Sequence, residues 1–149
     1  MKNCHFFLLA AVVVVAAGCV KEPPPVVVRP LPGACSLDVP AAGAGVSKAQ
    51  AVRIEGWAFN TLSQTVPKEV EIIFTTQDGR TSKSVKAERD LKRPDVASIF
   101  KNPTLEAAGY SVDVTLGDLP EGTYSVAVAQ KDENRILFCQ TPSVVQVVN

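Results

Sequence analysis

Apolar and polar residues alternate through much of residues 34–149, and this period-two pattern constrains the fold more than any other feature of the chain. Successive side chains of a strand point to opposite faces, so such alternation gives each strand one face that packs against a core. Roughly 115 residues are enough for one domain with a single core. The spacing of the runs is typical of an antiparallel β-sandwich or a barrel. Eight strands are predicted: Ser36–Val39, Ala51–Phe59, Glu69–Thr75, Thr81–Lys86, Tyr110–Leu116, Thr123–Ala129, Ile136–Cys139 and Ser143–Val148.

Turn residues between these runs predict how the strands connect. Asp78-Gly79 predicts a hairpin between the third and fourth strands, and residues 117–122 predict another between the fifth and sixth. In the second strand the apolar positions change from even to odd numbers at Gly56, which predicts a glycine β-bulge. Residues 93–100 are the exception. Pro94 suits a first helical turn and the apolar residues after it follow helical spacing, so we expect one short helix that caps an end of the sandwich.

The first 18 residues have the layout of an export signal. Lys2 precedes a hydrophobic run of about 12 residues, which is shorter than the roughly 20 that cross a membrane. The run ends in Ala16-Ala17-Gly18-Cys19, which resembles the lipobox of bacterial lipoproteins. That resemblance implies cleavage before Cys19 and lipid on its sulfur. Because Val20 follows instead of an aspartate, it also implies an outer-membrane destination in a Gram-negative host. The alternative is an ordinary secreted protein in which Cys19 carries no lipid.

Residues 19–33 contain five prolines and have no periodic apolar face. They are predicted to be an extended tether, which at about 3.1 Å per residue holds the domain up to roughly 40 Å from the lipid surface. The domain boundaries expected from sequence are therefore a signal peptide at 1–18, a lipidated tether at 19–33 and a β-sandwich at 34–149. The alternative for Val26–Val28 is an edge strand added to the domain or to a partner.

Four cysteines reduce to a single pair in the mature chain. Cys4 is removed with the signal and Cys19 carries lipid, which leaves Cys35 and Cys139. Outside the cytoplasm these two are expected to form a disulfide that ties the start of the domain to its end. Two free buried thiols are the alternative.

Composition excludes several classes of function. The only histidine, His5, lies in the signal, so the mature chain cannot use Ser-His-Asp or Cys-His catalysis or a histidine-ligated metal. Without Lys2, 14 basic residues face 15 acidic ones, and no basic cluster points to nucleic acid. Glu69 and Glu71, and likewise Asp132-Glu133, are expected to be ordinary solvated carboxylates. The sequence predicts no enzyme activity, no cofactor and no metal.

Four short motifs resemble a β-sandwich module of bacterial envelope and glycan-assembly proteins. They are Gly56-Trp57-Ala58-Phe59, Arg93-Pro94-Asp95-Val96-Ala97, Ala108-Gly109-Tyr110 and Leu119-Pro120-Glu121-Gly122-Thr123-Tyr124. The resemblance implies an Ig-like sandwich outside the cytoplasm with a binding or accessory role.

Three residues of these motifs are candidates for ligand binding. Core packing is the favoured interpretation of Trp57, Tyr110 and Tyr124, and the alternative is a platform for a sugar ring or a protein. A structural role at the junction of a loop and a helix is the favoured interpretation of Arg93 and Asp95. The alternative is an exposed ion pair that orients a ligand.

These observations predict a membrane-tethered envelope lipoprotein that recognises a glycan or an envelope protein without catalysing a reaction. The alternative is an assembly subunit that docks into a larger complex through a sheet edge or through Val26–Val28.

Overall fold

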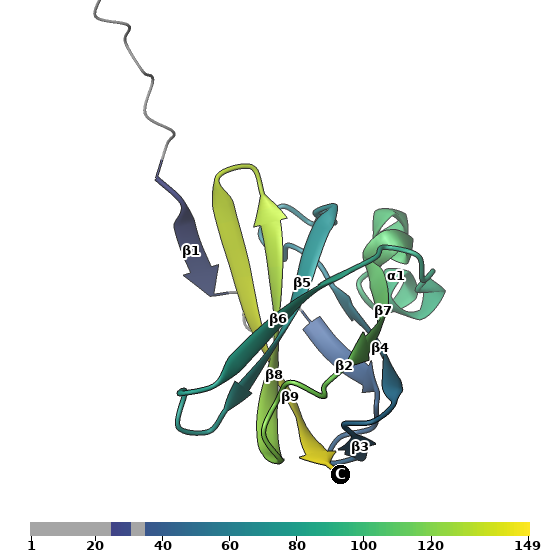
Figure 1. The fold of residues 1–149 in the computed structure, drawn as a ribbon. Coiled ribbons are helices and arrows are strands. Elements are labelled where there is room, and N and C mark those ends of the chain that lie inside the picture. The colour runs from purple at the N-terminus through teal and green to yellow at the C-terminus, as the bar shows by residue number, and fades with distance from the viewer. Residues whose placement is uncertain (1–24, 31–34) are drawn as a thin grey trace, which may run out of the picture.

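The computed structural model describes residues 25–30 and 35–149, which form two stacked β-sheets with a small helical segment at one end (Figure 1). The large sheet has the strand order β1-β9-β8-β5-β6, with β3 paired to β9, and the small sheet has the order β2-β4-β7. The strands are β1 (Val27–Pro30), β2 (Cys35–Val39), β3 (Gly45–Ser47), β4 (Ala51–Ala58), β5 (Glu69–Thr76), β6 (Ser82–Ala87), β7 (Gly109–Thr115), β8 (Gly122–Asp132) and β9 (Arg135–Val148); the helical segment comprises α1 (Pro94–Ile99) and the 3-10 helix η1 (Pro103–Ala108). The predicted all-β sandwich is therefore confirmed.

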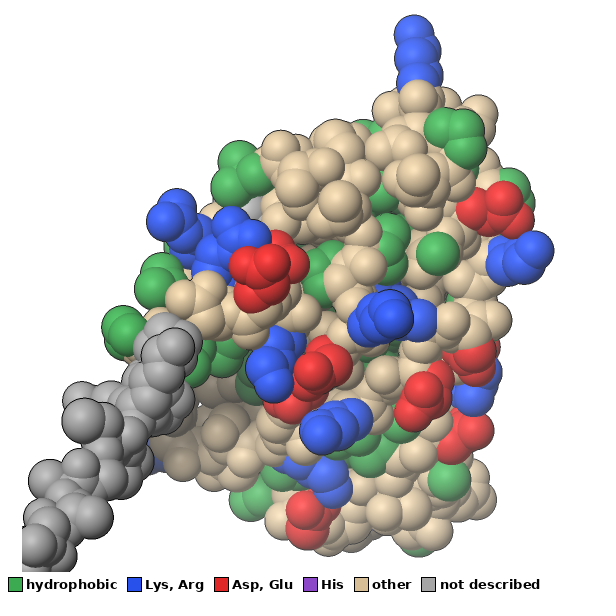
Figure 2. All heavy atoms as spheres, turned by 90° about the horizontal axis from the view of Figure 1, so that it is seen from above, with side chains coloured by type: hydrophobic (Ala, Val, Ile, Leu, Met, Phe, Trp, Pro, Cys, Tyr) green, Lys and Arg blue, Asp and Glu red, His purple; other side chains and the backbone are tan. Residues whose placement is uncertain are grey.

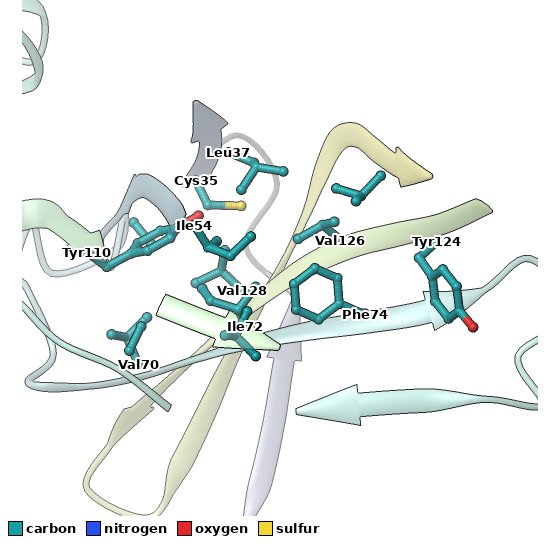
Figure 3. Packing of buried hydrophobic residues seen from close by; sticks show 14 of the residues in the cluster. Cys35, Leu37, Ile54, Val70, Ile72, Phe74, Tyr110, Tyr124, Val126 and Val128 are labelled. Atoms are coloured by element: carbon teal, nitrogen blue, oxygen red, sulfur yellow. The ribbon is translucent and has the colours of Figure 1, made fainter. Parts of the chain in front are cut away.

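The core lies between the two sheets and contains the alternate residues that the sequence pattern selects (Figure 3). Ile72 and Phe74 of β5 and Val126 and Val128 of β8 are completely buried, and Ile54 of β4 faces them from the small sheet. Burying one such side chain stabilises the fold by about 1.5–3 kcal/mol relative to leaving it in water. The period-two pattern thus correctly identifies the inward faces of these strands.

A disulfide joins the two sheets, as the cysteine count predicts. Cys35 of β2 and Cys139 of β9 are bonded, with their Cα atoms 6.1 Å apart and 104 positions of sequence between them. Closing a loop of this length in the unfolded chain gives a stabilisation of roughly 4.7 kcal/mol in the chain-entropy model. The bond fixes the small sheet against the large one at the centre of the core.

The expected bulge at Gly56 is wrong, because β4 keeps an unbroken alternation along its pairing with β7. Ile54, Gly56 and Ala58 all face inward, and the irregularity lies in the partner strand β2 instead. Glycine is required at position 56 because the Tyr110 side chain covers it. A Cβ atom there would lie 2.1 Å from the Ser36 carbonyl oxygen and 2.4 Å from the Tyr110 hydroxyl, which itself donates to that carbonyl at 2.8 Å.

The expected hairpin at residues 117–122 is also wrong, because this turn crosses from one sheet to the other. β7 pairs with β4 in the small sheet, whereas β8 pairs with β5 and β9 in the large sheet. The Tyr124 hydroxyl donates to the Pro120 carbonyl at 2.8 Å and holds the crossing in place. The Asp78-Gly79 turn does join the antiparallel pair β5 and β6, and Gly79 adopts a φ of 69° there.

The last two predicted strands are one continuous strand, β9. Between the pairs Ser125–Val144 and Ala127–Gln140, one residue of β8 lies opposite three of β9, so β9 bulges around Pro142. A proline cannot donate to the ladder, and a bulge is where a strand tolerates it. The short strand β3, which pairs in parallel with the end of β9, was not predicted.

The segment before the disulfide contributes an edge strand, which is the alternative that the sequence left open. β1 pairs in parallel with β9, with Val27 opposite Arg135 and Pro30 opposite Phe138. The valine side chains 26–28 are exposed. The rest of the predicted tether, the signal peptide and Cys19 lie outside the described residues.

Candidate functional site

Trp57, Arg93 and Asp95 lie at the same end of the sandwich, which we call the helical end (Figure 1). It consists of residues 57–68, residues 88–108 and the turn between β8 and β9. The Asn60 side-chain amide donates to the Asp132 carboxylate at 3.2 Å and so ties the first of these segments to the third. The structure therefore places the three candidate residues, which the sequence offered as separate candidates, at one end of the sandwich.

Trp57 lies on the outer face of the small sheet, not in the main core. It is half-buried and stacks on Phe59, with ring centroids 5.8 Å apart and an interplanar angle of 24°. Phe100 completes the cluster edge-on, 5.9 Å from Trp57 and 4.8 Å from Phe59. Phe59 also belongs to a second small core, together with Val96, Leu105 and Ala108. The three aromatics therefore cover the packing of the helical segment against the sheet.

Tyr110 and Tyr124 do not join Trp57 in an exposed platform. Both are completely buried in the main core (Figure 3). Burial in the core raises the pKa of each phenol above its usual value. The interpretation of these two residues as core packing is confirmed, and Trp57 alone of the three reaches the surface.

The predicted helix is present as α1, but only one of its three apolar residues is buried. Val96 faces the small core, whereas the side chain of Ile99 is 73% exposed and that of Phe100 is 38% exposed. Leu62, in the neighbouring segment, is also 73% exposed. Asn102 donates its side-chain amide to the Gln64 carbonyl at 3.2 Å and so holds the two segments together. We call Leu62, Ile99, Phe100 and Trp57 the apolar surface of the helical end.

Arg93 binds two carboxylates at the start of α1. Its guanidinium forms a bidentate pair with Asp95, at 2.9 and 2.7 Å, and a single short bond to Asp38 of β2. The hydrogen bonds and charge of Arg93 lower the pKa of Asp95 to about 2, and the two carboxylates raise the pKa of Arg93. The side chain of Arg93 is only 18% exposed. The arrangement links the helical segment to the small sheet, and the half-exposed edge of Asp95 is what a ligand can reach.

Arg89 is a structural residue that the sequence does not reveal. It lies in a run of mixed charges that predicts a solvated connection, yet its guanidinium donates to three backbone carbonyls and one side chain. The acceptors are Pro67 at 3.1 Å, Ala58 at 3.0 Å, Ala108 at 2.6 Å and the Gln130 amide oxygen at 2.9 Å. Burial lowers the pKa of Arg89 to about 10, so the group is still charged at neutral pH. Arg89 thus closes the helical end over the main core.

The described carboxylates do not form a metal site. Among residues 25–30 and 35–149, no group of three or more Asp, Glu, His or Cys side chains could hold a metal ion. Glu69 and Glu71 border a hollow on the outer face of the large sheet, which is open to solvent. In the same part of the chain, no helix is long and apolar enough to cross a membrane.

Comparison with known proteins assigns no family. No protein-family model matches the chain, and no curated protein matches it. A solved structure described as an endo-beta-1,4-mannanase from Thermotoga petrophila is similar over 78% of this chain, with a TM-score of 0.45 and 13% sequence identity. The similar region is 20% of that chain, so this chain spans about a fifth of the mannanase.

Proposed function

We propose that this chain is an outer-membrane lipoprotein whose Ig-like domain binds a glycan or an envelope protein and catalyses no reaction. The observation that carries the binding role is the apolar surface of the helical end, where three large apolar side chains stand exposed on a disulfide-bonded sandwich. Exposed aromatic and aliphatic groups on a rigid scaffold are typical of binding sites. The half-exposed Asp95, which lies in the same helix as Ile99, supplies a polar group that can orient a ligand.

Two features support the Ig-like interpretation of the sandwich. Tyr124 lies near the start of β8 and its hydroxyl binds the carbonyl four residues upstream, which is the geometry of the tyrosine corner of Ig-like folds. The same turn crosses between the sheets, as Greek-key connections do. The disulfide differs from that of antibody domains, because it joins the first strand of the small sheet to the last strand of the chain.

The outer-membrane location is supported by the lipobox-like Ala16–Cys19 and by the disulfide, which persists in an oxidising compartment. The absence of histidine from the mature sequence supports a non-catalytic role.

The binding role can be tested with the soluble chain Val20–Asn149, which keeps β1 in place. We expect saturable retention on purified envelope glycans or stoichiometric capture of one protein from solubilised membranes, and weaker binding by Phe100→Ser. Val148→Ser, which changes an exposed apolar residue in the final strand, is the matched control. Equal binding by both variants would mean that the helical end is not the binding surface.

An assembly role is the second candidate, and β1 is the observation that favours it. Val26 and Val28 are 63% and 62% exposed, and among the described strands β1 pairs only with β9. A partner strand could therefore extend the large sheet at this edge. Capture of a protein partner that is lost with Val26→Lys and Val28→Lys, but kept with Phe100→Ser, would favour assembly over ligand binding.

A further inference from the structure

We infer that the helical end faces the anchoring membrane and that its apolar surface contacts the lipid interface. This inference rests on the proposed lipid anchor at Cys19 and names the occupant of the proposed binding surface. It follows from where the chain enters the sandwich, from how much chain separates that point from Cys19, and from where the exposed apolar residues gather.

The chain enters the sandwich at the helical end. The first pair of β1 joins Val27 to Arg135, at the start of β9, and the Val27 amide donates to the Asn134 carbonyl at 3.0 Å in the β8–β9 turn. Asn60 and Asp132 connect this turn to the segment that carries Leu62. In Figure 1 the start of β1, the β8–β9 turn and α1 all lie at the same end, opposite the C-terminus and β3.

The chain between the anchor and the domain is short because β1 is part of the sheet. The first paired residue of β1, Val27, lies eight positions after Cys19, and a chain of this length spans at most roughly 28 Å when fully extended. The 11 residues of β8 run from one end of the sandwich to the other and are about 35 Å long at 3.2–3.4 Å per residue. Since the link is shorter than the domain, the far end cannot turn toward the anchoring membrane while β1 stays paired.

The end that faces the membrane has the chemistry of an interfacial surface. Leu62 and Ile99 are each 73% exposed, and Phe100 is 38% exposed with its ring centroid 5.9 Å from that of Trp57. Figure 2 looks onto this end and shows hydrophobic side chains among Lys, Arg, Asp and Glu side chains, with the two signs of charge interspersed. Apolar and aromatic groups among such polar groups suit the headgroup region of a bilayer. Only a weak contact is needed, because the anchor holds the surface at a high effective concentration.

Trp57 is the only tryptophan and reports directly on this contact. The lipidated chain, purified from membranes, is reconstituted into phosphatidylcholine vesicles with or without brominated acyl chains, which quench nearby tryptophan emission. We expect Trp57 emission to fall in the brominated vesicles, and we expect Leu62→Ser combined with Ile99→Ser to reduce that fall by half or more. Val148→Ser, in the final residue of β9, is the matched control and should be quenched like the wild type.

Vesicle flotation separates the two proposals. Protein that floats with the vesicles but shows equal emission in both lipids would overturn the membrane contact and leave the anchor intact. Protein that does not float would overturn the anchor and the contact together. Quenching that the double variant leaves unchanged would overturn the assignment of the contact to the apolar surface. Capture of a glycan or a protein through Phe100, without quenching, would assign the surface to that ligand instead.

Discussion

At Gly56 the small sheet leaves no room for a side chain. An added methyl group would lie 2.1 Å from a backbone oxygen of β2, and backbone cannot move aside as a flexible side chain can. We therefore expect Gly56→Ala to destabilise the protein by about 1–3 kcal/mol, as overpacking does. Gly45→Ala is the matched control, since its Cβ would make only an ordinary 3.8 Å contact with Val148. Urea unfolding of both variants measures the difference, and equal stabilities would contradict the packing described for Tyr110.

Arg89 is expected to matter for stability although it lies in a charged stretch. Arg89→Met removes four hydrogen bonds and leaves acceptors without partners, including the side-chain oxygen of the completely buried Gln130. Each hydrogen bond from a charged donor contributes about 1.5–3 kcal/mol, so we expect a loss of at least about 2 kcal/mol in unfolding free energy. Arg80→Met, at a side chain that is 86% exposed, should change stability by about 0.5 kcal/mol or less. Similar thermal unfolding midpoints for the two variants would contradict the role of Arg89.

Asp95 tests the Arg93 arrangement through its titration. Its pKa is lowered to about 2 from an ordinary value of 3.8, chiefly because Arg93 donates hydrogen bonds to the carboxylate. A lowered pKa means that the stabilisation is complete above pH 3.8 and is lost as the pH falls toward 2. In NMR titrations we expect Arg93→Gln to return the pKa of Asp95 toward 3.8. A wild-type Asp95 that already titrates near 3.8 would show that the ion pair does not form in solution.

At the scale of elements, the pairing of β1 with β9 determines whether residues 27–30 belong to the tether or to the sheet. If β1 pairs with β9 as described, a chain that begins at Ala34 should stay folded, because the disulfide and core are intact. In this shorter chain, amide hydrogen exchange at Arg135–Phe138 should nevertheless be faster than at the same residues of the chain Val20–Asn149, because this stretch becomes an edge of the sheet. Exchange in Val126 and Val128, which pair elsewhere, serves as the internal control. Unchanged exchange in 135–138 would mean that the segment is tether only.

Local patterns predicted the strands well because alternation is a property of a single strand. The runs in β5 and β8 identified their buried faces correctly, and Pro94 located the start of α1. Pairing between strands depends on distant residues. The sequence therefore did not show that β7 and β8 lie in different sheets, or that Pro142 sits in a bulge of one long strand.

The candidate site was predictable only in part, for the same reason. The motifs selected Trp57, Arg93 and Asp95 as candidates but not the residues that they contact, which include Phe100 and Asp38. The sequence pattern at Gly56 predicts a bulge, because the sequence does not show that Tyr110 packs over this position. Arg89 has no local signal, because its acceptors lie on four separate segments and a charged residue in a charged run predicts a solvated surface.

At the scale of the whole molecule, the disulfide, the edge strand and the short link form one arrangement. The disulfide fixes the sheets against each other, β1 fixes the entry of the chain at the helical end, and that entry at Val27 lies eight positions after Cys19. With lipid on Cys19, the domain would be held close to a membrane in a restricted orientation. Without lipid on Cys19, nothing in this arrangement would hold the exposed apolar side chains of the helical end near a membrane.

The intact mass of the protein purified from the membrane fraction of its host is the direct test of the lipid anchor. We expect the mass of residues 19–149 with the Cys35–Cys139 disulfide and acyl chains on Cys19. We also expect Cys19→Ala to move the protein out of that fraction. A mass that lacks lipid, or a mature chain that begins at another residue, would contradict the lipoprotein assignment and the orientation that depends on it.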